Sequence, residues 1–473
     1  MSTASRAPAP RRLTRGPISP QLLHLAWPVF VSRALHTLYG TADTAWVGRL
    51  SPEAIAAVST CFFASWTLFA VGDIPMAGAT AIVSRAIGAG DDARATRAAL
   101  TAAAMAIALG VVVALLAFFA SGPFFGFLFD NDSIAQMATR YFRLFSMAAP
   151  LLYLGFVIEA VFRSCGDSRT PMKVLLGGTI VNIVLDPLLI LGIGPFPKWG
   201  VPGAAAATVI AEAGVVAVYV SLVLRDRVPL PRPEKGIRSA ISWAEARRMF
   251  PIGLPHLLVG TLFSSVYMFL TRFAGEFGAP TLAALGIVNR LESLNYLTAT
   301  AVGMGVAAMV GQNLGAQRPD RAARTAHVGA RWITLTTGVT TALFLLSAEP
   351  IVRLFTPDPG VVELGALFLR IVAVSQVFMG WEIVYGHAFT GAGNTIPPML
   401  VSVIVSVARI PMAWWLAFPA GMGAAGIWWT ISATGVVRGL LVTGWFLLGR
   451  WKRTDPGAEP VHTAPLGPDS PEG

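Results

Sequence analysis

The stretch SRAIGAGDDARATRAA at residues 84–99 returns as GQNLGAQRPDRAARTA at residues 311–326, with six of 16 positions identical. The shift between the two copies is 227 residues. The same shift relates Pro28 to Pro255, and it relates FRSCGDSRTPM at 162–172 to FTGAGNTIPPM at 389–399. A constant shift over so long a stretch indicates that the chain contains an internal duplication.

The composition indicates the class of protein. Of 473 residues, 55% are apolar and only 13% are charged, against about 25% charged in an ordinary soluble domain. The mean hydropathy is +0.64, and the apolar residues come in blocks long enough to cross a bilayer as helices. Two cysteines are too few for a disulfide scaffold, and the apolar content excludes disorder along the whole chain.

The apolar blocks predict twelve spans, six in each copy of the repeat. They are expected at 24–47, 55–80, 99–120, 142–162, 172–193, 202–224, 250–271, 281–310, 328–348, 364–388, 398–418 and 423–448. Because six is even, both copies enter the membrane in the same direction. We therefore expect an all-α polytopic membrane protein with twelve transmembrane helices in two pseudo-symmetric six-helix lobes.

The basic residues between the blocks give the orientation. Alternate connections, starting with the N-terminal segment, hold 24 Lys and Arg residues, and the others hold seven. By the positive-inside rule both termini lie in the cytoplasm. We expect a multi-pass protein of the inner membrane, monomeric in the lipid bilayer. The net charge of +10 is explained by these loops, and no basic stretch carries the interleaved aromatic residues that single-stranded nucleic acid requires. Nucleic acid is not expected as a partner.

The repeat and the connections divide the chain into five parts. We expect a cytoplasmic N-terminal tail at 1–20, an N-lobe at 21–224, a cytoplasmic linker at 225–249, a C-lobe at 250–450 and a disordered cytoplasmic tail at 451–473. Secondary transporters built from parallel repeats bind their substrate between the halves. A channel or a membrane enzyme is the alternative from a different class, because these also duplicate.

Motifs for enzyme chemistry are missing from the sequence. It contains no Walker A phosphate loop, no H-E-x-x-H or C-x-x-C motif and no nucleophile elbow. We therefore expect no enzymatic activity and no cofactor. A pump of this kind would take its energy from an ion gradient, with H+ or Na+ as the coupling ion.

Four polar residues are expected at one depth in the outer half of the N-lobe. Asp43, Asp186 and Thr208 lie about five to seven residues from the outer ends of their spans. Asn182 precedes Asp186 by four residues and so shares its helix face. Pro187 has no N–H to offer the carbonyl of Ile183. Two carboxylates, an amide and a hydroxyl suit a hard cation or a shared proton. Pairing of either acid with Arg33 or another buried cation is the alternative.

The duplication provides an internal control for this site. At the shift of 227, Asp43 corresponds to Leu270, Asn182 to Arg409 and Asp186 to Ala413. A residue needed only for helix packing would more readily be present in both halves. The acids therefore favour an ion site.

Weaker candidates complete the set of functional residues. We expect Pro28 to act as a hinge in the first span. Acids within the other spans are candidates for lining the substrate cavity, and these are Glu159, Glu212, Glu292 and Glu382.

The ordered motifs resemble those of the multidrug and toxic compound extrusion (MATE) family. The resemblance runs from about Pro28 to Leu448. Its motifs are DTAWVGRL (43–50), GAG (88–90), the GDSRTP and GNTIPP loops, NIVLDP (182–187), PGAAAAT (202–208), NRLES (289–293) and GQNLGA (311–316).

The resemblance implies two lobes around a V-shaped cavity and cation-coupled export of small amphiphilic, often cationic compounds. It also implies a cation site in the N-lobe at Asp43, Asn182, Asp186 and Thr208. The seventh span lacks the acid that other branches of the family carry, which argues against an ion site in the C-lobe. A related lipid-linked precursor flippase is the alternative of similar fold.

Overall fold

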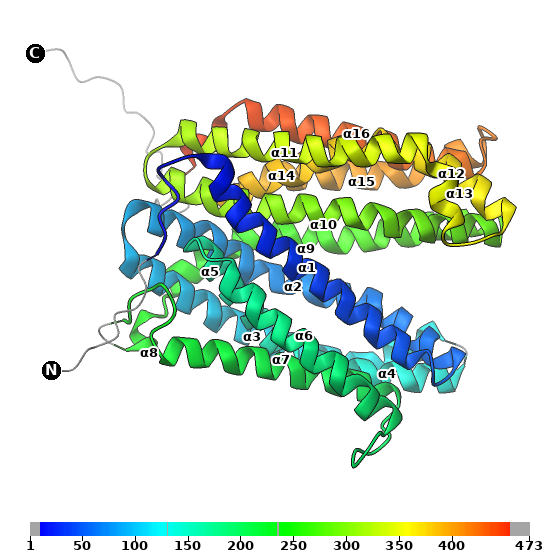
Figure 1. Cartoon of the computed structure of the whole chain (residues 1–473), viewed down its shortest axis with the longest axis horizontal. Helices are drawn as coiled ribbons and strands as arrows, with labels where there is room; N and C mark the ends of the chain where they lie inside the picture. The colour runs from blue at the N-terminus through cyan, green and yellow to red at the C-terminus, as the bar shows by residue number, and fades with distance from the viewer. Residues whose placement is uncertain (1–9, 130, 234–235, 455–473) are drawn as a thin grey trace, which may run out of the picture.

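The computed structural model describes residues 10–129, 131–233 and 236–454, and the described part is helical without strands (Figure 1). The helices of the first half are α1 (Ile18–Val47), α2 (Pro52–Ala89), α3 (Asp92–Leu128), α4 (Asp132–Ser146), α5 (Ala149–Ser164), α6 (Arg169–Leu191) and α7 (Val201–Leu224). Those of the second half are α9 (Trp243–Gly275), α10 (Ala279–Gly315), α11 (Pro319–Leu346), α12 (Ala348–Arg353), α13 (Pro359–Ala373), α14 (Gln376–Ala392), α15 (Ile396–Ala417) and α16 (Ala424–Leu447). The short α8 (Ile237–Ala240) lies in the part of the sequence that connects the two halves.

These helices account for twelve spans. Eight are long and apolar enough to cross a membrane by themselves, and the bent pairs α4–α5 and α13–α14 each add one. The remaining two, α1 and α11, have 30 and 28 residues. They are the repeat counterparts of α9 and α3, which do meet that criterion. The arrangement of six spans in each half is therefore confirmed.

The fourth and tenth spans differ from the continuous segments that hydropathy predicted. Each consists of two helices that meet at a bend, of 47° between α4 and α5 and of 51° between α13 and α14. In the first pair, Pro150 follows the break and has no N–H to continue the helical ladder. In the second, the hydroxyl of Ser375 donates to the carbonyl of Val372, 2.8 Å away, at the break itself.

Close contacts between the two halves show the pseudo-two-fold symmetry directly. Gly88 on α2 lies against the backbone of Gln312 on α10, and Gly315 lies against the backbone of Arg85. Each contact becomes the other when the two numbers are shifted by 227. Gly311 lies against Ser84, which is its own repeat counterpart. The axis that relates the lobes therefore passes between α2 and α10 here, and we call these three contacts the seam.

The lobes touch mainly in one half of the bundle. The closest contacts of α2 with the other lobe run from Ala70, against Gly260, to the seam. Figure 1 shows the two groups of helices close together at the end that carries residues 10–17 and 450–454, and spread apart at the other end. We call the first of these the basic end, because the predicted cytoplasmic connections meet there.

The N-terminal segment is tied to both lobes instead of forming a free tail up to residue 20. The N–H of Arg11 donates to the carbonyl of Cys165 in the N-lobe, 2.9 Å away. The N–H of Leu13 donates to the side-chain oxygen of Gln312, 2.6 Å away, while the Gln312 amide donates to Ser164 at 2.7 Å. Leu13 is 1% exposed. Residues 10–14 therefore close the basic end of the seam.

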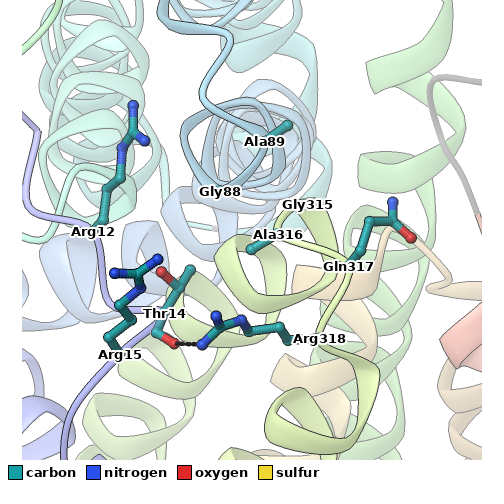
Figure 2. A pocket seen from close by; sticks show the side chains of 9 residues that line it. All are labelled: Arg12, Thr14, Arg15, Gly88, Ala89, Gly315, Ala316, Gln317 and Arg318. Atoms are coloured by element: carbon teal, nitrogen blue, oxygen red, sulfur yellow. Dashed lines mark hydrogen bonds between the residues drawn. The ribbon is translucent and has the colours of Figure 1, made fainter.

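A cavity of about 610 Å³ lies at this point, on the symmetry axis (Figure 2). The repeat counterparts Gly88 and Gly315, and with them Ala89 and Ala316, line it from opposite lobes. Three arginines from the N-terminal segment and from the start of α11 complete its wall, and these are Arg12, Arg15 and Arg318. Arg318 donates to the carbonyl of Thr14 at 2.9 Å.

Two helix limits in the structure differ slightly from the domain limits expected from the sequence. The helix α9 starts at Trp243, where the hydroxyl of Ser242 accepts from the N–H of Glu245, so the connection between the lobes is shorter than 225–249. At the other end, Arg450–Arg453 form a 3-10 helix, and Trp451 is 1% exposed and stacks on Phe446. The predicted tail at 451–473 therefore begins with ordered residues, and its positions 455–473 lie outside the described residues.

The GDSRTP and GNTIPP loops form tight turns at their repeated glycines. Gly166 has φ +84° and Gly393 has φ +74°, a left-handed conformation that other residues adopt only with strain. In each case a proline follows in the first turn of the next helix, Pro171 in α6 and Pro398 in α15.

The orientation can be tested by cysteine labelling. Lys198 lies in the connection between α6 and α7, Arg318 lies directly before α11 at the basic end, and both are exposed. Cysteines introduced at these positions should react with an impermeant maleimide from opposite sides of the membrane, with Arg318 on the cytoplasmic side. The native Cys61 and Cys165 are 0% and 1% exposed, so the background should be low. Reaction of both introduced cysteines from outside would contradict the twelve-span arrangement.

Candidate functional site

The structure brings the four polar residues of the N-lobe together. Asp43 on α1 has Asp186, Asn182 and Thr208 as its polar neighbours, from α6 and α7. All four are buried, with exposures between 0% and 5%. The amide of Asn182 donates to one oxygen of Asp186, 3.3 Å away, as expected from residues one turn apart on the same helix.

Three oxygens in this group have no hydrogen-bond donor. They are Oδ1 of Asp43, Oδ1 of Asn182 and Oδ2 of Asp186. Buried polar atoms in folded proteins are mostly paired, so three acceptors without a donor on neighbouring side chains need an explanation. A proton or a hard cation would satisfy such a set of oxygens.

The acids do not have an arginine partner. None of the ion pairs in the described part of the chain includes Asp43 or Asp186. Arg33 instead approaches the sulfur of Met304, 3.7 Å away. The alternative of a structural pair with Arg33 is therefore not what the structure shows. The described residues also contain no group of three or more His, Cys, Asp or Glu side chains placed to hold a metal ion.

Two tyrosines near the acids were not predicted from the sequence. Tyr39 precedes Asp43 by one helical turn, and its hydroxyl lies near Thr208. Tyr141 on α4 is 6% exposed and lies close enough to Asp43 and Asp186 to interact with their charge. The spacing of four residues between Tyr39 and Asp43 was a signal in the sequence, whereas Tyr141 required the tertiary fold.

The C-lobe has no equivalent of this site. Leu270 and Ala413, which correspond to Asp43 and Asp186, are fully buried in one apolar cluster. Arg409, which corresponds to Asn182, is 3% exposed and donates through Nε to the hydroxyl of Thr434 at 2.8 Å. A cation would meet a guanidinium there instead of carboxylates.

The four weaker candidates separate into two groups. Glu159 and Glu382 are paired with arginines, at 3.7 Å to Arg163 and at 3.1 Å to Arg438. Glu212 on α7 and Glu292 on α10 form no ion pair within the described residues.

Glu292 belongs to a chain of amides that the sequence did not reveal. It accepts from the amide of Gln376 at 2.7 Å, and the oxygen of that amide accepts from Asn295 at 2.8 Å.

The first helix connects the site to the other lobe. Before Pro28, Leu22 and Leu25 belong to a buried cluster of the C-lobe. After it, Val47 belongs to the core of the N-lobe, next to Asp43 on the same helix. Pro28 lies between these two parts, where the helical ladder lacks one N–H.

Two parallel six-span lobes with a symmetry axis between them are the architecture of membrane transporters built from parallel repeats. The chain belongs to the MatE family, whose profile matches residues 28–188 and 255–415. Both limits of the second match are those of the first shifted by 227, so the family's domain is the repeat itself.

Known relatives extend over nearly the whole chain. A probable multidrug resistance protein NorM of Thermotoga maritima is 29% identical over 446 residues, 92% of this chain and 94% of the relative. An FAD transporter of Shewanella oneidensis is 27% identical over 402 residues, 84% of this chain and 87% of the relative.

Solved structures share the fold. A MOP superfamily transporter from Pyrococcus furiosus superposes with a TM-score of 0.85 at 22% identity, covering 94% of this chain and 98% of that one. A MATE family transporter in an outward-facing conformation superposes with a TM-score of 0.84, also at 22% identity, over the same shares of the two chains.

Proposed function

We propose that this protein exports amphiphilic, often cationic compounds in exchange for H+ or Na+, and that the ion binds at Asp43, Asn182, Asp186 and Thr208. Multidrug efflux is the activity for which the relatives from Thermotoga maritima and Staphylococcus aureus are named. The observation that carries the coupling ion is the set of three unpaired oxygens in the N-lobe.

The ion and the substrate are coupled through α1. Two carboxylates side by side at membrane depth repel each other when both are ionised. A bound proton or cation removes this repulsion, and α1 then repacks about Pro28, which is its hinge. The N-lobe part of the helix moves relative to the part held by the C-lobe, and the cavity closes on the substrate side. The ion and the substrate each favour a different arrangement of the same helix, and this difference couples their transport in opposite directions.

The membrane setting follows from the same features. The basic end faces the cytoplasm, both termini lie there, and the protein is a monomer in the inner membrane. The lobes are closed at this end by the seam and spread apart at the other, so the arrangement seen is one that opens away from the cytoplasm.

Transport in proteoliposomes tests the proposal. The purified protein is reconstituted with the cationic dye rhodamine 123, and a proton gradient or a sodium gradient is imposed separately, each with an ionophore control. We expect dye movement against its concentration under one of the gradients and none after the ionophore. A folded protein that moves no dye under either gradient would contradict antiport, and downhill flux alone would favour a channel.

A further inference from the structure

The C-lobe contains a buried guanidinium that forms no ion pair within the described residues. Arg409 on α15 is 3% exposed, and within the described residues its hydrogen bond to Thr434 is the only one that its side chain forms. No carboxylate of the described part lies within 4 Å of it. Arginine has five N–H donors, and an unpaired charge inside a membrane protein is retained mainly where it has a function.

A carboxylate without a cation lies in the same lobe. Glu292 accepts from the amide of Gln376 and forms no ion pair among the described residues. Arg409 lies within electrostatic reach of both Glu382 and Glu292, and within the described residues it forms an ion pair with neither. The other arginine and glutamate of this region, Arg438 and Glu382, pair with each other at 3.1 Å. Arg409 and Glu292 are therefore left without an ion-pair partner among the described residues.

The fold does not require this arrangement. At the shift of 227, Arg409, Glu292 and Thr434 correspond to Asn182, Ser65 and Ala207 of the N-lobe, none of which is charged. Both lobes form the same six-span bundle. The open charges are thus a property of the C-lobe and not of the scaffold.

An aromatic surface leads from these charges toward the other lobe. Tyr267 on α9 lies within electrostatic reach of both Glu292 and Arg409. Its ring is 4.6 Å from that of Phe263, which is 40% exposed and lies 6.4 Å from Trp66 of the N-lobe. An apolar ring system can lie along these side chains while its charged groups reach into the C-lobe.

We propose that the C-lobe binds a zwitterionic amphiphile, with its carboxylate on Arg409 and its cationic group at Glu292. This inference rests on the proposed efflux function and adds the substrate class and the residues that select it. The planar guanidinium binds a carboxylate through two parallel hydrogen bonds, which a neutral ester cannot form with the same strength. Arg409 therefore distinguishes an acid from its ester.

Two dyes that differ only in this group test the assignment. Rhodamine 110 has a free benzoate, and rhodamine 123 is its methyl ester. Binding of each dye to the purified full-length protein in nanodiscs is measured by fluorescence polarisation. Arg409→Gln should weaken rhodamine 110 binding about tenfold or more, as expected for the loss of a charge-assisted bond, and should leave rhodamine 123 within about twofold. Glu292→Gln should weaken both dyes alike.

Arg438→Gln is the matched control, because this arginine already has a carboxylate partner and should not discriminate between the dyes. If Arg409→Gln does not yield monodisperse protein, Arg409→Lys retains the charge but loses the two parallel hydrogen bonds, and it should reduce the preference for the acid without abolishing it. Equal effects of Arg409→Gln on both dyes, or loss of the preference in the lysine variant, would overturn the assignment.

This result is separable from the test of antiport, because binding in nanodiscs needs no gradient. If the protein exports dye but Arg409→Gln changes the binding of neither dye, only the C-lobe site is contradicted. A protein that shows the predicted binding pattern but exports neither dye would contradict only the efflux function.

Discussion

Asp43→Asn should fold and insert normally and yet lose gradient-driven efflux down to the level of empty liposomes. The amide has the size of the carboxylate and satisfies its neighbours, but it carries no charge to be neutralised by an ion. The variant should therefore remain in the arrangement that the ion-bound protein adopts. Asp186→Asn should behave in the same way, because both carboxylates contribute to the repulsion that the ion removes.

Asp73→Asn is the control for this prediction. Asp73 lies on α2, outside the group around Asp43, and the charge that influences it is that of Arg33. Asp73→Asn should reduce efflux less than Asp43→Asn does. The measurement is dye efflux from proteoliposomes as a function of pH and of sodium. If Asp43→Asn pumps at the wild-type rate with unchanged dependence on both, the N-lobe site is wrong and Glu292 or Glu382 becomes the better candidate.

Gly88→Ala should open the basic end of the protein. A Cβ at this position would overlap the backbone of Gln312, which cannot move aside as a side chain would. Overpacking of this kind costs about 1–3 kcal/mol, which corresponds to roughly a fivefold to 150-fold shift between two states of the lobes. The arrangement closed at the seam loses population, and gradient-driven efflux should fall with it.

The native Cys165 reports this opening. It is 1% exposed and lies under the N-terminal segment, where its carbonyl accepts from Arg11. In a Cys61→Ser background it is the only thiol, and it should react with a maleimide much faster in Gly88→Ala. Gly286→Ala on α10 is the control, because nothing lies within 4 Å of a Cβ there. Unchanged reactivity of Cys165 together with wild-type efflux would show that the seam does not hold the closed state.

The sequence by itself determined the class, the number of spans and the two-lobe symmetry. The class and the number of spans depend on apolar blocks that must each cross a bilayer, and the symmetry depends on a repeat that must fold the same way twice. All three can therefore be recognised from short stretches of the sequence. It also placed Asp43, Asn182, Asp186 and Thr208 at one level, because depth along a span and a spacing of four residues are local quantities.

Tertiary structure decided which charges are paired and which are left open. The sequence treated Glu159, Glu382 and Glu292 alike. Glu159 pairs with Arg163 four residues further along the same helix, but the arginine of Glu382 and the amide of Glu292 come from other helices, which only the packing brings near. The N-terminal segment likewise reads as a tail, and its bond from Leu13 to Gln312 joins residues 299 positions apart. Such pairings depend on distances between different helices, and a pattern of hydropathy along the chain does not contain those distances.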